Sequence, residues 1–176
     1  MRPLKAEEID VRVGQVGEGY VVPLLYKDAR VDRQILDETF GQFDWQCDYK
    51  EIKGNMYCGI AVWDEHKQAW VWKWDCGTES NTEKEKGEAS DAFKRAGFRW
   101  GIGIELYNTP RIYLNVATDK AGARYKMHNP RELNGLYVSH IKSVNGKIVE
   151  LDLAQRSRAG TRIVWSTDKR KEGTAV

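Results

Sequence analysis

Residues 82–103 carry apolar and polar side chains with the period of an amphipathic helix. The apolar positions recur every three or four residues, at Ala89, Ala92, Phe93, Ala96 and Trp100. This spacing gathers them on one side of a helix, where they can be buried together. Thr82 and Glu85 have the spacing of a capping box, and Gly101 follows the last apolar position. We therefore predict one long helix that ends at a glycine.

The segment before this helix has the pattern of three successive strands. Alternating runs rich in β-branched and aromatic residues cover Asp44–Ile52, Met56–Trp63 and Ala69–Asp75. The first connection is Lys53-Gly54-Asn55, whose glycine and asparagine tolerate positive φ, and the second, at residues 64–68, is polar. The pattern predicts a three-stranded antiparallel meander, which together with the helix gives a β-β-β-α core.

Tryptophans are concentrated in the third predicted strand. Trp70, Trp72 and Trp74 alternate with other residues, so a strand places all three indoles on one face of the sheet. We expect the long helix to cover this tryptophan face. We also expect the indoles to form core or a subunit interface, in preference to a role in stacking nucleobases.

Two helices and a strand are predicted nearer the N-terminus. Leu4–Val13 has apolar residues at helical spacing, and so does Asp28–Phe40, which Gly41 ends. Tyr20–Tyr26 is apolar and rich in residues that favour strands. Pro23 within it lacks an N–H, which makes this segment an edge strand or an extended lead-in.

The last third of the chain is predicted to be rich in strands. Asn145-Gly146 is a strong turn signal between Leu136–Val144 and Lys147–Leu153, and this predicts a C-terminal hairpin. Arg111–Leu114 and Arg162–Ser166 are further strand candidates.

These elements define the expected fold class and domain organisation. The polar residues 117–134 have the composition of a loop, and the charged residues 168–176 that of a disordered tail. The remaining chain, residues 1–167, is expected to be one domain. We predict an α+β fold: an antiparallel β-β-β-α core with N-terminal helices and a C-terminal β-hairpin.

Composition and charge limit the classes of function that this chain can have. The 176 residues are 41% hydrophobic and 31% charged with a net charge of +2, so nucleic-acid binding has to depend on where the cations lie. No apolar run reaches membrane-spanning length and the first residues lack the apolar core of a signal peptide, so we expect a cytoplasmic protein without a membrane partner. Cys47, Cys58 and Cys76 form no C-x-x-C pair. We expect free thiols in a reducing cytoplasm and no zinc site.

The chain shows no catalytic motif. His66, His128 and His140 fall in a predicted turn, loop and strand, and none has a recognisable nucleophile beside it. The glycines at 101 and 103 follow a helix, so their amides do not point at a phosphate from a helix N-terminus. No Walker A loop is present. We expect no enzyme activity, no metal and no cofactor.

The polar side of the long helix carries both signs of charge. Lys86, Ser90 and Lys94 lie four residues apart on one stripe, with Arg95 and Arg99 beside it. Periodicity leaves two readings open: the cations pair with acids on a solvated face, or they form a fixed groove for an anionic polymer. The acids available on this helix are Glu83, Glu85, Glu88 and Asp91.

The order of these features is specific. It runs from Phe40-Gly41-x-x-x-Trp45 through the three strands to Lys86-x-x-x-Ser90-Asp91-x-x-Lys94-Arg95-Ala96-x-x-x-x-Gly101. This order resembles the Rad52-type single-strand annealing proteins (Rad52/Rad22 and the phage Sak-like members), over most of the chain. The resemblance implies a Rad52-like fold and ATP-independent binding and annealing of single-stranded DNA in homologous recombination and DNA repair. It also implies a phage or prophage source in a bacterial host, a homo-oligomeric ring, and a single-strand-binding protein as a candidate partner.

The resemblance further implies which cations hold DNA. Lys94 and Arg95 match the paired basic residues that grip single-stranded DNA, and Lys86 matches another basic position of the same groove. Arg30 matches an arginine on the opposite wall, and Lys84, Arg99 and Lys73 are nearby cations with weaker claims. The DNA-binding residues implied in this way are Lys94, Arg95, Lys86, Arg30, Lys84 and Arg99.

Two other classes of protein stay open. A hot-dog acyl-thioesterase also combines a long helix with antiparallel strands. It would need an apolar acyl channel and a catalytic carboxylate near the start of the helix, such as Glu83, Glu85 or Glu88. The helix is highly charged where that channel would run. A purely structural oligomer would use the tryptophan face for assembly alone.

Overall fold

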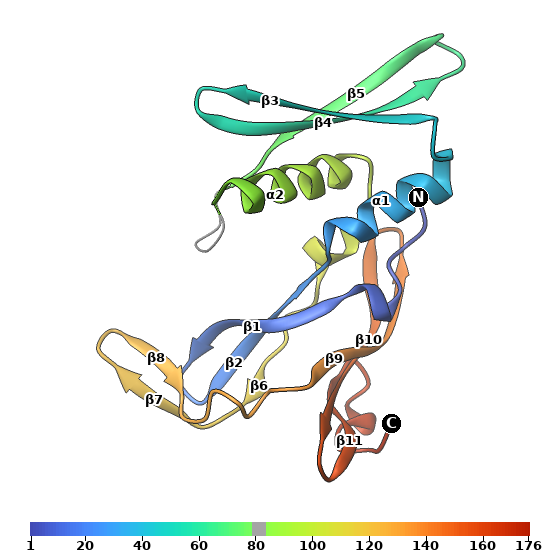
Figure 1. Cartoon of the computed structure of the whole chain (residues 1–176). Helices are drawn as coiled ribbons and strands as arrows, with labels where there is room; N and C mark the ends of the chain where they lie inside the picture. The colour runs from blue at the N-terminus through green and yellow to red at the C-terminus, as the bar shows by residue number, and fades with distance from the viewer. Residues whose placement is uncertain (79–83) are drawn as a thin grey trace. The chain divides into compact units, whose positions relative to one another are not determined.

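The computed structural model describes residues 1–78 and 84–176, with side chains described for 1–78 and 87–176. In this part the chain is an α+β protein with antiparallel sheets and two α-helices (Figure 1). No helix among the described residues is both long and apolar enough to span a membrane.

The chain divides into two compact units. Unit 1 comprises residues 1–3 and 28–104, and unit 2 comprises residues 4–27 and 105–176. Most of unit 1, residues 28–104, is therefore inserted in the sequence of unit 2. The single domain expected for residues 1–167 stays a prediction.

The sheet of unit 1 confirms the predicted meander. It consists of β3 (Trp45–Ile52), β4 (Asn55–Asp64) and β5 (Ala69–Cys76), paired antiparallel in that order. The β3–β4 turn holds Lys53 and Gly54 at positive φ, 54° and 74°. These angles suit a tight hairpin turn, which is why a glycine is needed there.

Helix α1 (Ala29–Phe40) also follows the prediction. The side chain of Asp28 accepts a hydrogen bond from the backbone N–H of Arg30 (2.8 Å) and caps the N-terminus. Gly41 ends the helix with a φ of 91°, a conformation that glycine adopts without a steric penalty.

Helix α2 (Lys84–Arg99) is the long helix predicted from periodicity. The side chains of its predicted capping box, Thr82 and Glu85, lie outside the described residues. Its apolar side is buried on the sheet, where the rings of Trp45 and Phe93 lie 6.2 Å apart. Among the described side chains of this helix, Ala92, Phe93 and Ala96 are buried.

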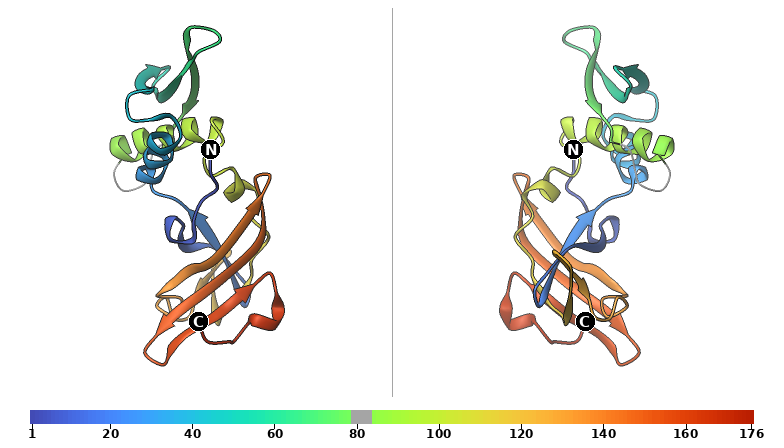
Figure 2. Two further views of the ribbon diagram at one scale, coloured as in Figure 1. Left: turned by 90° about the vertical axis from the view of Figure 1, so that its right-hand side faces the viewer. Right: turned by 90° about the vertical axis from the view of Figure 1, so that its left-hand side faces the viewer.

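The prediction that α2 covers the tryptophan face is wrong. Figures 1 and 2 show α2 along one face of the sheet, and two side chains of β5 identify that face. The Lys73 ammonium lies 4.1 Å from the centroid of the Trp100 ring, and Asp75 pairs with Arg95 of α2. Since side chains alternate along a strand, the tryptophans of β5 point to the opposite face. On the α2 side, β4 contributes the buried residues Cys58, Ile60 and Val62.

The opposite face is aromatic and packs largely on itself. We call Trp63, Trp70, Trp72 and Trp74 the aromatic face. The rings of Trp72 and Trp74 are stacked at 5.3 Å, and those of Trp63 and Trp70 meet edge to face at 5.6 Å. Gly59 makes room for Trp74, because a Cβ there would overlap the indole. No described helix or strand of unit 1 covers this face (Figure 1).

Gly77 lies where the chain passes from the sheet towards α2. Its N–H donates to the carbonyl of Met56 (2.9 Å). A Cβ at this position would overlap the main chain of α2 at Glu88 and Ala92. Because the backbone of a packed helix cannot swing aside as a long side chain can, only glycine fits here.

Unit 2 is built from antiparallel strands. Their bounds are β1 (Asp10–Gly17), β2 (Tyr20–Tyr26), β6 (Leu114–Asn115), β7 (Thr118–Ala121), β8 (Arg124–Met127), β9 (Leu136–Val144), β10 (Lys147–Ser157) and β11 (Gly160–Ser166). They form two sheets, ordered β1-β2-β6 and β11-β10-β9, and a separate β7–β8 hairpin. The predicted C-terminal hairpin is confirmed, with Asn145 and Gly146 at φ values of 51° and 72° in its turn.

Two predictions for unit 2 are wrong. Leu4–Val13 is not a helix, because only Ala6–Glu8 forms a turn of 3₁₀ helix and β1 follows it. Pairing with β2 stabilises the extended form of this valine-containing segment, and that pairing is a non-local effect. The loop predicted at residues 117–134 contains the β7–β8 hairpin, with Gly122 at a φ of 63° in its turn.

The prediction that Tyr20–Tyr26 is an edge strand or an extended lead-in is also wrong, because β2 lies between β1 and β6 in its sheet. Pro23 lies opposite Val13 of β1, next to an irregularity in the β1–β2 register. On the other side of β2, β6 pairs only with Tyr20 and Val21. At Pro23 the strand therefore has a neighbour on one side only, where a missing N–H is tolerated.

The C-terminal segment is attached to β11. Residues 168–176, for which the sequence predicts disorder, include a 3₁₀ turn at Lys169–Lys171. The N–H of Ile163 donates to the carbonyl of Thr174 (2.9 Å). The buried carboxylate of Asp152 in β10 accepts hydrogen bonds from Ser166 (2.5 Å) and Lys171 (2.9 Å). The bond from Lys171 attaches the C-terminal segment to the sheet.

Candidate nucleic-acid interface

A cationic cluster forms where α2 crosses β5. Arg95 Nε lies 3.3 Å from Asp75 Oδ1, and Arg99 Nε lies 3.0 Å from Asp75 Oδ2. The two arginines are four residues apart and so occupy the same side of the helix, one turn from each other. One carboxylate thus holds two guanidinium groups whose side chains remain about half exposed, at 42% and 54%.

Asp75 stays charged in this cluster. Its burial acts to raise its pKa, but the N–H of Cys76 and the charges of Arg99 and Arg95 outweigh that effect and lower the pKa below its usual range. With one negative and two positive charges, the cluster keeps an excess of positive charge. Because the guanidinium groups are fixed before any ligand arrives, less conformational entropy is lost when they bind an anion.

Lys73 has a structural role beside this cluster. Its ammonium donates to the carbonyl of Arg99 (3.0 Å) and lies over the ring of Trp100. A cation at the C-terminus of a helix satisfies a free carbonyl and interacts favourably with the helix dipole. The structure therefore gives Lys73 a role in holding the end of α2, beside the weaker DNA-binding role predicted from the sequence.

A second group of charged side chains comes from the start of α1 and from α2. Arg30 Nε pairs with Asp28 Oδ1 (3.0 Å). Hydrogen bonds from Arg30 lower the pKa of Asp28, burial opposes this, and the charges of Arg30 and Lys94 lower it further. Lys94 is half-buried and makes no hydrogen bond or ion pair with any described residue. Two of the implied DNA contacts, Arg30 and Lys94, thus lie near one carboxylate.

The implied contacts therefore fall into three sets. Arg30 and Lys94 lie near Asp28, and Arg95 and Arg99 converge on Asp75. The side chains of Lys84 and Lys86 lie outside the described residues. Asp75 is the residue that sequence reasoning missed. The sequence signal was that Asp75 follows Lys73 by two positions, which puts both side chains on one face of the strand. The helix that follows carries two arginines four residues apart, on one of its sides.

The acids of α2 do not neutralise these cations in the described residues. Glu88 accepts a hydrogen bond from the backbone N–H of Met56 (2.8 Å), and Asp91 accepts from the N–H (3.0 Å) and hydroxyl of Thr78. Both acids tie the helix to neighbouring chain. Glu83 and the side chain of Glu85 lie outside the described residues. The counter-charge observed for Arg95 is therefore Asp75 of β5, and not an acid of α2.

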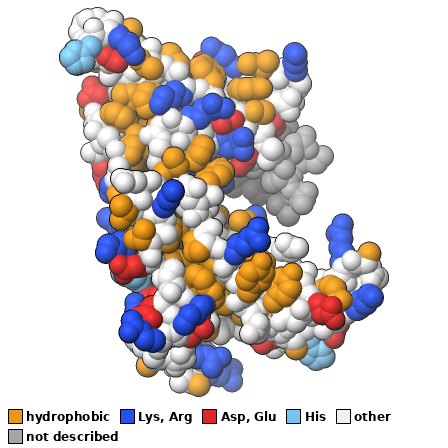
Figure 3. Space-filling view, turned by 180° about the vertical axis from the view of Figure 1, so that it is seen from behind, with side chains coloured by type: hydrophobic (Ala, Val, Ile, Leu, Met, Phe, Trp, Pro, Cys, Tyr) orange, Lys and Arg blue, Asp and Glu red, His pale blue; other side chains and the backbone are white. Residues whose placement is uncertain are grey.

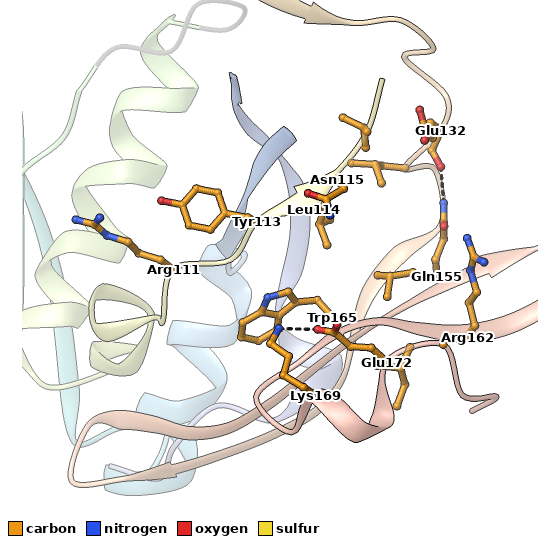
Figure 4. Close-up of a pocket in the computed structure, with 15 residues that line it drawn as sticks. Arg111, Tyr113, Leu114, Asn115, Glu132, Gln155, Arg162, Trp165, Lys169 and Glu172 are labelled. Atoms are coloured by element: carbon orange, nitrogen blue, oxygen red, sulfur yellow. Dashed lines mark hydrogen bonds and ion pairs between the residues drawn. The ribbon is translucent and has the colours of Figure 1, made fainter. Parts of the chain in front are cut away.

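Unit 2 has a cavity that sequence reasoning also missed (Figure 4). It measures about 740 Å³ and is lined by residues 111–116, except 112, and by parts of β10, β11 and the C-terminal segment. Lys169 pairs with Glu172 (2.6 Å) and lies over the Trp165 ring, while Gln155 donates to the Glu132 carbonyl (2.5 Å). Its walls come from distant parts of the sequence, so no contiguous motif marks it. The polar groups bonded within it offer no nucleophile with an adjacent base.

The described histidines and acids were compared with the requirements of a metal site. No cluster of three or more His, Cys, Asp or Glu side chains that could hold a metal occurs in the described part of the chain. His128 pairs with Asp119, and His140 with Glu150, and all four side chains are exposed. On the surface seen in Figure 3, Lys and Arg side chains are interspersed with hydrophobic ones and do not form one continuous basic area.

No protein-family model matches this chain, and no curated protein is similar enough to serve as a relative. What classifies the molecule is therefore its α+β architecture with antiparallel sheets. The resemblance to Rad52-type proteins stays a prediction from the sequence.

Proposed function

We propose that this protein binds single-stranded DNA and anneals complementary strands without ATP, as a Rad52-type protein acting in homologous recombination or DNA repair. The observation that carries the proposal is the arrangement of cations on α2. Its apolar side is buried on the sheet, Arg95 and Arg99 are held by Asp75, and Lys94 has no polar partner among the described residues. A packed helix with fixed cations is a rigid template for a chain of phosphates.

Such a template suits annealing for a physical reason. Two complementary strands repel each other, and each must be held with its bases exposed before pairing can start. Cations that neutralise phosphates release counterions, which gives affinity without sequence preference. Pairing energy then drives the reaction, so the protein needs neither a nucleotide nor a metal.

Binding is expected to favour single strands, to ignore sequence and to weaken steeply with salt. The logarithm of the binding constant should fall linearly with the logarithm of salt concentration, by about 0.7 for each phosphate neutralised. Fluorescence anisotropy with labelled oligonucleotides, at several salt concentrations, measures both the slope and the preference. Equal or tighter binding to blunt duplex, or strong preference for one sequence, would contradict the proposal.

The aromatic face supports assembly as a further part of the proposal. Monomeric proteins seldom expose large contiguous apolar patches, and four tryptophans line this uncovered face of unit 1. Strands β3 and β5 are the edges of the same sheet and have ladder groups free to pair with another copy. We propose that copies assemble into a closed ring, in which no edge is left exposed.

A ring has a simple expected result in solution. Multi-angle light scattering at micromolar protein and moderate salt should give a mass of several subunits, because burial of the aromatic face stabilises the assembly. A monomer under these conditions would rule the ring out. An oligomer that neither binds nor anneals DNA would instead support the second candidate, a purely structural assembly built on the same aromatic face.

A further inference from the structure

Two of the three cysteines lie side by side on the α2-facing side of the sheet. The Sγ atoms of Cys47 in β3 and Cys58 in β4 are 3.5 Å apart. In the ladder Cys47 is opposite Ile60 and Cys58 is opposite Tyr49, so the two cysteines are diagonal neighbours on the same face. The sequence gives no hint of this pairing, because the two residues belong to different strands and have no C-x-x-C spacing.

The two thiols have different surroundings. Cys47 is exposed, whereas Cys58 is fully buried. The hydrogen bond with Cys58 lowers the pKa of the Cys47 thiol, against the effect of burial, and Tyr49 adds to the lowering. The same hydrogen bond, together with burial, raises the pKa of Cys58. The exposed sulfur is therefore the one that reaches the thiolate form and that solvent can reach.

We propose that Cys47 and Cys58 form an oxidation site in which Cys47 reacts with a hydroperoxide and Cys58 resolves the product to a disulfide between β3 and β4. This site is independent of the DNA-binding proposal. An exposed thiol beside a resolving thiol is the arrangement that reversible cysteine oxidation requires.

The chemistry balances in two steps. The Cys47 thiolate attacks the distal oxygen of the hydroperoxide, whose O–O bond breaks. Cys47 becomes a sulfenic acid, and the peroxide is reduced to an alcohol or water after taking up a proton. The Cys58 sulfur then attacks the Cys47 sulfur, a water molecule leaves, and the disulfide forms. A disulfide is about 2.05 Å long. The sulfurs must therefore approach each other, and β3 can move because it is paired on one side only.

The test uses the full-length protein, freed of reductant and treated with hydrogen peroxide. Intact mass spectrometry of the denatured protein should show a mass lower by two hydrogens, and after alkylation the oxidised protein should carry one alkyl group in place of three. Non-reducing peptide mapping should join the peptides that carry Cys47 and Cys58, and dithiothreitol should restore both thiols. If the three thiols of the folded protein are oxidised at equal rates, or if the mapped disulfide involves Cys76 or joins two chains, the proposal is overturned.

Variants separate the two roles. Cys58→Ala should let the sulfenic acid accumulate on Cys47, where dimedone labels it, and should prevent the disulfide. Cys47→Ser should slow loss of thiols about tenfold or more, since the buried and half-buried cysteines that remain are poorly accessible. Cys76→Ser is the matched control and should oxidise like the wild type, because its sulfur is bonded to the Gly77 carbonyl and not to a thiol. Should Cys58→Ala fail to fold, the wild-type disulfide map alone still decides the matter.

Discussion

Replacing Lys94 and Arg95 together with alanine is expected to abolish strand annealing while the protein stays folded. Neither side chain belongs to the buried side of α2, so the substitutions do not change the core formed by Ala92 and Phe93. Asp75 keeps Arg99 and the N–H of Cys76 as partners after the change. The loss of a partly exposed ion pair then costs less than about 1 kcal/mol of stability.

The effect on DNA should be larger than the effect on stability. If each cation contributes about 1 kcal/mol to phosphate binding, the dissociation constant rises about thirtyfold. The salt slope should fall by about one to two units. Annealing should suffer more than binding, because misplaced phosphates spoil the register of the two strands. The measurement is annealing of labelled complementary oligonucleotides, run beside thermal melting and sizing.

A matched control removes the same two charges elsewhere. Lys67→Ala with Arg170→Ala also deletes one lysine and one arginine, both exposed and both paired with nearby aspartates. This variant should anneal like the wild type. If both double variants lose annealing equally, net charge and not position is responsible. Wild-type annealing by the Lys94 and Arg95 variant would refute the site.

The second large effect concerns stability. Gly77→Ala is expected to lower the free energy of unfolding by about 3 kcal/mol, because the new methyl group meets the main chain of α2 and forces helix and sheet apart. Urea unfolding followed by circular dichroism measures this loss. Annealing should fall with it, since α2 carries the cations.

The control for this substitution is Gly101→Ala. Gly101 has a φ of 91° and open space where a Cβ would be, so alanine there costs only backbone strain, about 1 kcal/mol. A larger loss at Gly77 than at Gly101 supports the close approach. If Gly77→Ala is as stable as the wild type, the packing of α2 on this segment is not as tight as its geometry indicates.

Local signals explain which elements could be predicted from the sequence. The three strands of unit 1, both α-helices and the Asn145-Gly146 hairpin follow from periodicity and turn chemistry that operate within a few residues. Strand β1 could not be predicted in this way. The spacing of its apolar residues also fits a helix, and only pairing with β2 decides between the two.

The sequence also could not predict which face of the sheet α2 covers, and here the reason is different. Alternation shows that β5 has two faces, but not which of them is buried, and the tryptophans suggested the wrong one. Gly59 of β4 leaves room for the Trp74 indole on one face, while Ile60 is buried on the face that α2 covers. The same reversal placed Asp75 beside Arg95, which made Asp75 part of the candidate site.

The insertion of residues 28–104 within the sequence of unit 2 has a consequence for the order of folding. Pairing of β2 with β6 closes a loop that contains all of residues 28–104, whereas the β1–β2 and β9–β10 hairpins close over short turns. The entropy of closing a long loop must be lost before the contact is gained, so such pairings form slowly. The β1-β2-β6 sheet is therefore completed late, after the local hairpins. Until then β2 has an open edge, and the proline within it limits how well another chain could pair there.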